Sequence, residues 1–450
     1  MPDVAGPRTF LRSAQFLRLY STRVTSAVAD GIFQAALASY VLFNPQNATT
    51  PGRAAAAFAA VLVPYSVAGP FAGVFLDRWY RQRVLVFGNT VKVLLVAAVA
   101  ALVATGADGA VFFGAAIAAL GVNRLFLSAL SAALPHVVDE AELVPANAIS
   151  TTSGSIATIA GAGIGGILRV GFGSRPGVIA AIVGLSAVAY AASAAIATTM
   201  ARDLLGPDAQ GRLSSREGTK LRAAATVVVE LGQAIRYIRR RRRAAHALAA
   251  ISAHRFLFGI ASLTTVLLFR NYFSGPGNVS SGILGLGAVL GASGAGIVVG
   301  ALITPAASRR LGTTRWITVL LAGAGVSIAV FGLPFQRVLL IIGGFLLGVS
   351  SQGVKICVDA TVQAEISDEF RGRVFSVYDM LFNVTYVAAA AVAATVLPNS
   401  GKSTVVMALI VVGYAVAALA FAAVSARSGD LGRDEVFETP NSSSRGGNRP

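Results

Sequence analysis

Long apolar runs recur along the whole chain, and each is long enough to cross a hydrocarbon core of about 30 Å as an α-helix. A segment in lipid must satisfy its backbone hydrogen bonds internally, so repeated runs of this length restrict the chain to a bundle of transmembrane helices. We therefore predict an all-α integral membrane protein with twelve transmembrane helices. The spans are expected at roughly 20–43, 54–76, 84–105, 109–134, 145–169, 177–200, 247–270, 280–306, 315–334, 336–362, 374–398 and 403–425.

Composition excludes a soluble fold for the same chain. Charged residues make up only 13% of the 450 residues, and the mean hydropathy is +0.70. A soluble chain of this length needs far more charge to cover its surface. The single cysteine, Cys357, lies in an apolar run, which excludes a disulfide framework and a cysteine zinc site. No hydrolase motif is present, so we expect neither an enzyme nor a bound metal or cofactor.

The net charge of +17 invites a nucleic-acid interpretation, which the positions of the charges exclude. Most of the 37 Lys and Arg residues fall on one side of the predicted spans. Such a bias marks the cytoplasmic side. We expect a multi-pass protein of the cell (plasma or inner) membrane with both termini in the cytoplasm, and no nucleic-acid partner.

The longest polar gap, 201–246, is expected to be a basic cytoplasmic linker. Its part from Lys220 to Arg243 has the pattern of an amphipathic helix and ends in five arginines, Arg239 to Arg243. We expect this cluster to bind anionic lipid, with a specific macromolecular partner as the alternative. Residues 1–19 are expected to form a cytoplasmic N-terminal segment, and the polar residues 426–450 a disordered cytoplasmic tail.

An internal repeat relates the two halves of the chain. An offset of 227 residues brings most spans into register and places Gly73 on Gly300 and Glu142 on Glu369. We therefore predict two pseudo-symmetric six-helix bundles, 20–200 and 247–425. Secondary transporters with this parallel duplication hold their substrate between the halves, near the membrane midplane.

The loop after the second span carries a glycine, an acid and arginines in close succession: Gly73, Asp77, Arg78 and Arg81. A glycine lets two helices approach closely. Asp77 can face the positive N-terminus of another helix, and the arginines can bind carboxylates or phosphates. At the repeated position the second half keeps Gly300 but has no acid.

This loop resembles the loop 2–3 signature of the major facilitator superfamily. Two further stretches, Phe16–Phe33 and Gln363–Ser376, resemble the branch that contains the enterobactin exporter and related macrolide and drug efflux proteins. The resemblance covers about residues 10–425 and implies a transporter with a cytoplasmic gate. We expect Asp77 to meet the start of the eleventh span, where Arg371 and Arg373 lie, when the protein is open to the outside.

The fifth span contains Gly161 to Gly166, which differs from the antiporter signature of exporters by Ala162 in place of proline. The same residues match the dinucleotide fingerprint G-x-G-x-x-G, which requires a preceding strand and the start of a helix. Neither fits inside a continuous apolar helix. We therefore expect these glycines to serve close packing between helices.

Ionisable residues inside the spans are candidates for function, because a charge at the centre of a bilayer is costly. Asp30 and Arg124 both lie ~15 Å from the cytoplasmic ends of their spans, at ~1.5 Å per residue. We expect both to face the central cavity and to interact, directly or through water. Lys92 has two interpretations of equal weight. It is a functional charge, or its side chain extends to the cytoplasm or holds helices together.

The second half has its own set of charges. Lys355 and Asp379 lie ~7–10 Å from the cytoplasmic end, Asp359 is one turn from Lys355, and Arg255 is as deep as Asp30. With Asp30 and Arg124, the residues Arg255, Lys355 and Asp379 are our candidates for proton coupling. Polar residues expected to line a substrate cavity are Gln34, Asn123, Gln352, Asn383 and Tyr386.

The sequence thus predicts a proton-coupled exporter of a small, partly apolar molecule such as a drug, siderophore or metabolite. A buried carboxylate, Asp30 first and Asp379 second, would take a proton from outside and release it inside. Two alternatives stay open: an importer of a small nutrient, and a receptor or assembly factor that keeps the fold without transport. We expect protons, substrate and lipid as partners, and a monomer.

Overall fold

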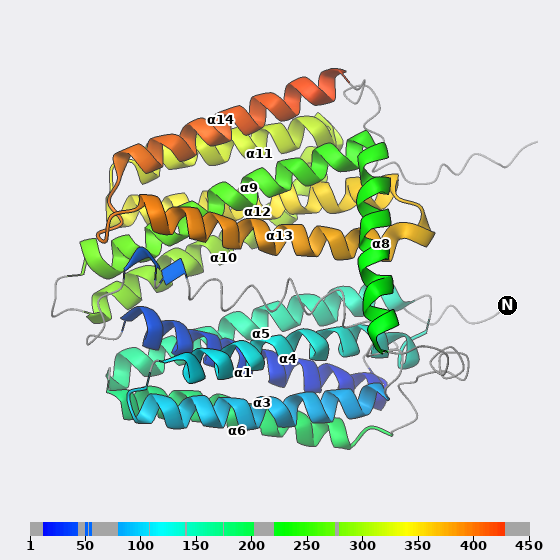
Figure 1. Cartoon of the computed structure of the whole chain (residues 1–450), viewed down its shortest axis with the longest axis vertical. Helices are drawn as coiled ribbons and strands as arrows, with labels where there is room; N and C mark the ends of the chain where they lie inside the picture. The colour runs from blue at the N-terminus through cyan, green and yellow to red at the C-terminus, as the bar shows by residue number, and fades with distance from the viewer. Residues whose placement is uncertain are drawn as a thin grey trace, which may run out of the picture. The chain divides into compact units, whose positions relative to one another are not determined.

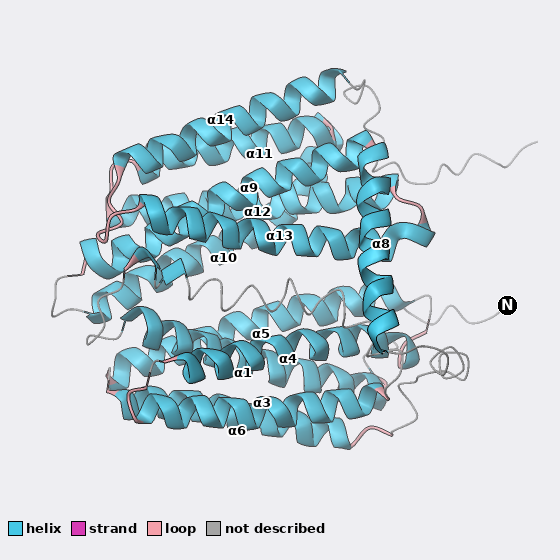
Figure 2. Cartoon of the chain, viewed as in Figure 1, coloured by secondary structure: helices cyan, strands magenta, loops and turns pink. Residues whose placement is uncertain are grey.

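The computed structural model describes residues 12–43, 50–52, 54–55, 80–107, 109–139, 142–173, 175–201, 220–274 and 279–427. Within these ranges every regular element is a helix (Figure 2). Eleven of the described helices are long and apolar enough to cross a membrane, as the sequence predicts. The span expected at 54–76 falls mostly on residues outside the described ones.

The helices of the first half follow the predicted spans closely, with ends that differ by up to six residues. The turn from α5 to α6 contains Gly173, whose φ of 94° suits glycine, and Pro176 begins the next helix at a position where no backbone donor is needed. The helices of this half are α1 (Ala14–Phe43), α3 (Arg81–Ala104), α4 (Ala110–Ala133), α5 (Leu143–Phe172) and α6 (Pro176–Thr198).

The second half repeats this arrangement after the linker helix α8 (Lys220–Arg240). Gly312, with φ 85°, lets the chain reverse direction in a single residue between α10 and α11. The helices of this half are α9 (Arg242–Leu267), α10 (Val279–Leu311), α11 (Thr313–Ser327), α12 (Arg337–Glu365), α13 (Asp368–Val396) and α14 (Thr404–Arg427) (Figure 1).

Contacts between residues divide the chain into two compact units. One comprises Met1–Leu231, Ser262–Gly287 and Asp379–Lys402, and the other comprises Gly232–Ala261, Ala288–Tyr378 and Ser403–Pro450. In the first unit α1 packs against α5 and α6, and α3 packs against α4 and α6. In the second unit α11 packs against α12 and α14. The domain boundaries expected at 200 and 247 stay predictions.

Glycines set the spacing between α1 and α5. A Cβ added to Gly31 would collide with the carbonyl oxygen of Thr158, and one added to Gly161 would collide with that of Val28. A Cβ on Gly165 would lie 3.2 Å from the carbonyl oxygen of Ile32. Small residues at helix interfaces allow this close approach. Gly161 and Gly165 therefore pack against α1, whereas Gly163 and Gly166 face open space.

The same kind of contact joins α10 and α12 in the second half. A Cβ on Gly300 would lie 2.7 Å from the carbonyl oxygen of Val349, and one on Gly348 would collide with that of Ser293. Gly300 is the repeat partner of Gly73 in the 227-residue register. The close packing expected of this glycine position is thus present in the second half.

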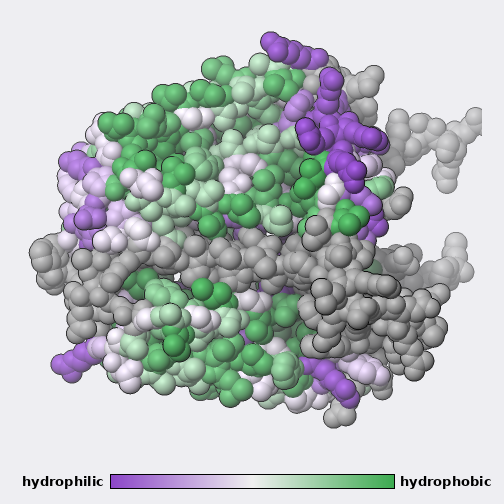
Figure 3. Space-filling view, in the orientation of Figure 1, coloured by the Kyte–Doolittle hydropathy of each residue, from purple (hydrophilic) through white to green (hydrophobic). Residues whose placement is uncertain are grey.

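The outer faces of the helices are apolar. Large hydrophobic side chains are strongly exposed along them, which a soluble surface does not tolerate but lipid does. Figure 3 shows hydrophobic side chains over the bodies of the helices and hydrophilic ones gathered around α8. Examples are Phe87 at 63%, Leu94 at 66%, Val111 at 73%, Leu302 at 73% and Leu419 at 72% exposed.

The linker helix α8 is anchored to the turn between α12 and α13. The ring of Tyr237 stacks on that of Phe370 with centroids 4.4 Å apart, and its hydroxyl lies 3.2 Å from Ser367 Oγ. This hydrogen bond lowers the pKa of the Tyr237 phenol. Arg243 Nη1 lies 3.7 Å from Glu365 Oε1. Arg239 to Arg242 remain exposed, so binding of anionic lipid by this cluster stays a prediction.

Candidate functional site

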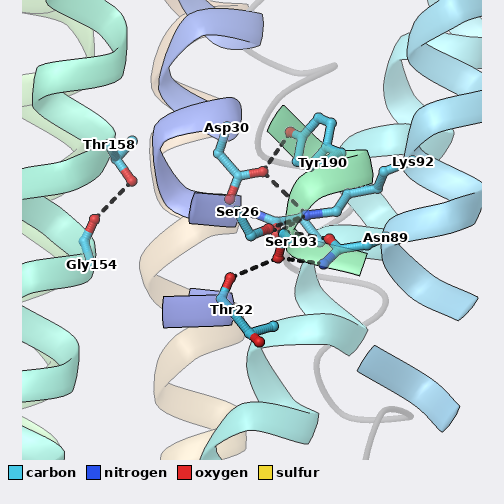
Figure 4. A network of polar contacts seen from close by, with 10 residues as sticks. Thr22, Ser26, Asp30, Asn89, Lys92, Gly154, Thr158, Tyr190 and Ser193 are labelled. Atoms are coloured by element: carbon cyan, nitrogen blue, oxygen red, sulfur yellow. Dashed lines mark hydrogen bonds and ion pairs between the residues drawn. The ribbon is translucent and has the colours of Figure 1, made fainter. Parts of the chain in front are cut away.

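A buried polar network joins four helices of the first half around Asp30. Tyr190 of α6 donates a hydrogen bond of 2.6 Å from its hydroxyl to Asp30 Oδ1, and Lys92 Nζ of α3 lies 3.4 Å from the same oxygen (Figure 4). The side chain of Lys92 is 1% exposed and that of Asp30 is 8% exposed. Asp30 is thus a carboxylate inside an apolar bundle that has a cation and a phenol as its partners.

Lys92 has an acceptor for each of its three donors. Besides Asp30, its ammonium donates to Ser26 Oγ at 2.9 Å and to Asn123 Oδ1 at 3.1 Å. It also lies 4.5 Å from the ring centre of Phe126 and 4.2 Å from that of Tyr190. Neutral acceptors and aromatic faces both stabilise a cation in an apolar environment. Lys92 is therefore held by one charged acceptor, two neutral acceptors and two aromatic faces.

The network continues from Ser26 across α3 and α6. Ser26 Oγ donates to Asn89 Oδ1 at 3.2 Å, and Asn89 Nδ2 donates to Ser193 Oγ at 2.7 Å. Ser193 Oγ in turn donates to the carbonyl oxygen of Thr22 at 2.7 Å (Figure 4). All these side chains are buried. A continuous series of buried hydrogen bonds of this kind fixes the rotamers of its members and the register of the helices.

Arg124 does not pair directly with Asp30, so the direct form of the expected interaction is wrong. Its Nη2 donates to Asp379 Oδ2 at 2.9 Å, and both residues belong to the first of the two units. Counting residues along a helix gives the position of a residue across the membrane but not the direction of its side chain. Lys92 of α3 is the cation that pairs with Asp30 in place of Arg124. The Arg124 and Asp379 side chains are 27% and 53% exposed, so solvent weakens the attraction between them.

Comparison with protein families identifies the fold. The model of the family described as Major Facilitator Superfamily matches residues 19–390. The chain belongs to the Major Facilitator Superfamily. An uncharacterized MFS-type transporter of Mycobacterium tuberculosis is 36% identical over 398 residues, covering 87% of this chain and 86% of the relative. The corresponding protein of Mycobacterium bovis matches to the same extent.

Solved structures of transporters share this Major Facilitator fold. A variant of the nucleoside transporter NupG matches with a TM-score of 0.68 at 14% identity, covering 91% of this chain and 99% of that one. A variant of the peptide transporter POT matches with a TM-score of 0.68 at 13% identity, covering 93% and 96%. The xylose transporter XylE of E. coli matches with a TM-score of 0.59 at 10% identity, covering 90% and 97%. The family makes this chain a secondary transporter of the membrane and not an enzyme.

The charges of the second half make contacts of their own. Lys355 Nζ contacts Asp359 Oδ2 at 2.6 Å on α12, as their spacing of one turn predicts. The guanidinium of Arg255 lies 6.0 Å from the ring centre of Phe258. The roles of Arg255, Lys355 and Asp379 in proton coupling stay predictions.

Three of the expected gate residues, Gly73, Asp77 and Arg78, lie outside the described residues. Arg81 begins α3 and contacts His136 Nε2. Arg371 is part of α13, and the guanidinium of Arg373 lies 5.5 Å from the ring centre of Phe370. The gate between the two halves therefore stays a prediction.

The expected cavity residues divide into two kinds. Asn123 is 3% exposed and is held by Lys92, and Tyr386 is 7% exposed. Gln34, Gln352 and Asn383 are partly exposed, and the Asn383 amide donates to the backbone oxygen of Asp379. Asn123 thus belongs to the buried network rather than to an open surface. Among the described residues no group of three His, Cys, Asp or Glu side chains is placed to hold a metal ion.

Sequence reasoning missed several members of the network. Tyr190, Ser26, Asn89 and Ser193 are uncharged residues in apolar spans, where small hydroxyls and tyrosines are common packing residues. The signal that could have found them is the depth of Lys92, because a fully buried lysine requires several acceptors around it.

Proposed function

We propose that this chain is a proton-coupled exporter of a small, partly apolar molecule and that Asp30 carries the proton. The observation that supports this role is the burial of Asp30 in a network that provides it with a counter-ion and a hydrogen-bond donor. A charged side chain at membrane depth costs at least ~2.5–3.5 kcal/mol. A charge that is present there despite this cost is therefore a candidate for a role in transport.

The proposed cycle uses alternating access of one site to the two sides of the membrane. With the site open to the outside, the Asp30 carboxylate takes up a proton. With the site open to the cytoplasm, it releases the proton, and substrate binds to the deprotonated form. Proton and substrate then move in opposite directions, because each favours a different protonation state.

One feature supports export as the direction. The segments Phe16–Phe33 and Gln363–Ser376 resemble the branch that contains the enterobactin exporter and drug efflux proteins. The solved structures named above are transporters of nucleosides, peptides and xylose, which supports a small molecule as substrate but does not select one.

Transport by inverted membrane vesicles tests this proposal. Vesicles with an acidic lumen, reported by a pH-sensitive dye, receive a panel of candidate compounds in the outer buffer. We expect at least one compound to enter in exchange for protons and to raise the luminal pH, and vesicles carrying Asp30→Asn to show no such change.

Two outcomes would contradict the proposal. Compounds loaded into the lumen could leave together with protons, which would identify an importer. If the purified protein binds some compounds of a broad panel and none of them changes the luminal pH, proton-coupled transport is ruled out.

A further inference from the structure

Each half of the chain contains one tyrosine that joins its last helix to its first. In the first half the Tyr190 hydroxyl of α6 donates to Asp30 of α1. In the second half the Tyr414 hydroxyl of α14 lies 3.2 Å from His254 Nδ1 of α9. The two residues of each pair are separated by the same 160 positions. In each half the tyrosine thus joins the last helix to the first, and its partner differs between the halves.

The two pairs differ in the charge around them. His254 and Tyr414 are fully buried, and the neighbouring charge is that of Arg255. Asp30 instead has Lys92 beside it, and Lys92 is held by groups that carry no charge: Ser26, Asn123 and two aromatic rings. Among the three acceptors of Lys92, Asp30 is the most distant. Loss of the negative charge on Asp30 would therefore leave Lys92 with its two shorter hydrogen bonds.

Both contacts to Asp30 reach the same oxygen, Oδ1. Among the residues that the structure describes, none donates to Oδ2. The described titratable groups that contact Asp30 are Lys92 from α3 and Tyr190 from α6. Beside Asp30, α5 packs glycine backbone against α1, and its buried Arg169 instead donates to Ser39 Oγ, nine positions along α1 from Asp30. The helix α4 contributes Asn123 and Phe126, which carry no charge.

We infer that Tyr190 is a positioning residue for the proton site: it holds Oδ1 of Asp30, so that the proton binds at Oδ2. This inference rests on the proposed function in that Asp30 carries the proton. In the step itself, a proton from the aqueous phase forms an O–H bond at Oδ2. The net charge of the network rises by one, and the reverse step restores the ion pair.

The hydrogen bond from Tyr190 stabilises the carboxylate more than the carboxylic acid. Its removal in Tyr190→Phe should let Asp30 take up its proton at higher pH. Hydrogen bonds to charged groups contribute about 1.5–3 kcal/mol, which corresponds to a shift of about one to two pH units. A difluorotyrosine introduced at position 190 keeps the shape of the ring and is a stronger donor, so it should shift the midpoint to lower pH.

The test is a pH titration of the purified protein in which infrared spectroscopy measures the carbonyl stretch of protonated Asp30. The band is assigned by its absence in Asp30→Asn. Tyr414→Phe is the matched control, because it removes the equivalent hydroxyl from the other half. We expect a shift to higher pH in Tyr190→Phe, a shift to lower pH with difluorotyrosine, and the wild-type midpoint in Tyr414→Phe.

An unchanged midpoint in folded Tyr190→Phe or with difluorotyrosine would overturn the inference, as would an equal shift in Tyr414→Phe. Folding is monitored by the thermal unfolding of each variant, and the difluorotyrosine protein supplies the answer if Tyr190→Phe does not fold. The titration needs no substrate. Failure of this inference is therefore distinct from failure of the proposed transport activity, which the vesicle assay measures.

Discussion

At the scale of single residues, the central feature is a buried ion pair whose two partners depend on each other. Lys92 and Asp30 are both almost fully removed from solvent. Removal of one member of a buried pair leaves an uncompensated charge, whereas replacement of both by neutral groups often has little effect. Comparing the single and the double replacement therefore shows whether the charges of the pair or the packing of its side chains stabilise the protein.

The variant Lys92→Met should lower the free energy of unfolding by about 3–5 kcal/mol, because Asp30 then lacks its cation. The double variant Asp30→Asn with Lys92→Met should recover much of this loss. Thermal and denaturant unfolding in detergent would measure both. A double variant as unstable as Lys92→Met alone would show that Lys92 acts through its packing and not through its charge.

The sequence predicted which charges lie within the spans and that Lys355 contacts Asp359, but not which residue pairs with Asp30. Asp30 and Arg124 have equal depth, and depth follows from counting residues along a helix. The partner of Asp30 depends on how α1, α3 and α6 are rotated about their axes, which periodicity does not define in spans that are apolar on nearly all sides. Tyr190 carried no signal because an uncharged tyrosine in an apolar run resembles an ordinary packing residue.

At the scale of helices, glycine spacing determines how closely α1 and α5 pack. A Cβ at Gly161 would meet the backbone of Val28, which has no flexible end to move away, whereas Gly163 on the same helix faces open space. We expect Gly161→Ala to cost about 1–3 kcal/mol of stability through overpacking. Gly163→Ala should be neutral or slightly stabilising, because alanine favours the helix.

Unfolding temperatures of the two alanine variants in the same detergent would measure this difference. Equal unfolding temperatures would mean that α1 and α5 are further apart than the structure has them. Sequence alone located the glycines and favoured packing over nucleotide binding. It could not say which glycines face α1, because that requires the rotation of α5.

The linker illustrates a second limit at this scale. Its basic pattern predicted an amphipathic helix from Lys220 to Arg243, and α8 runs from Lys220 to Arg240. Its anchor could not be predicted, because the stacking of Tyr237 on Phe370 joins residues more than a hundred positions apart. Local patterns define helices well, whereas contacts between distant segments depend on the tertiary fold.

At the scale of the whole molecule, duplication explains both the common architecture and the unequal chemistry. In each half a tyrosine of the last helix contacts a residue of the first helix 160 positions earlier. One half holds a carboxylate and a lysine at this place, and the other holds a histidine. The eleven spans among the described residues followed from hydropathy. The proton site, by contrast, depends on side chains that the two halves do not share.

The most direct test of proton coupling through Asp30 is the flux of an identified substrate into proteoliposomes, measured with and without a pH gradient. For the wild type we predict that the gradient drives substrate accumulation. For Asp30→Asn we predict that exchange of labelled for unlabelled substrate continues while the gradient has no effect. Gradient-driven accumulation by Asp30→Asn at the wild-type level would contradict the account, because the proton would then be carried elsewhere.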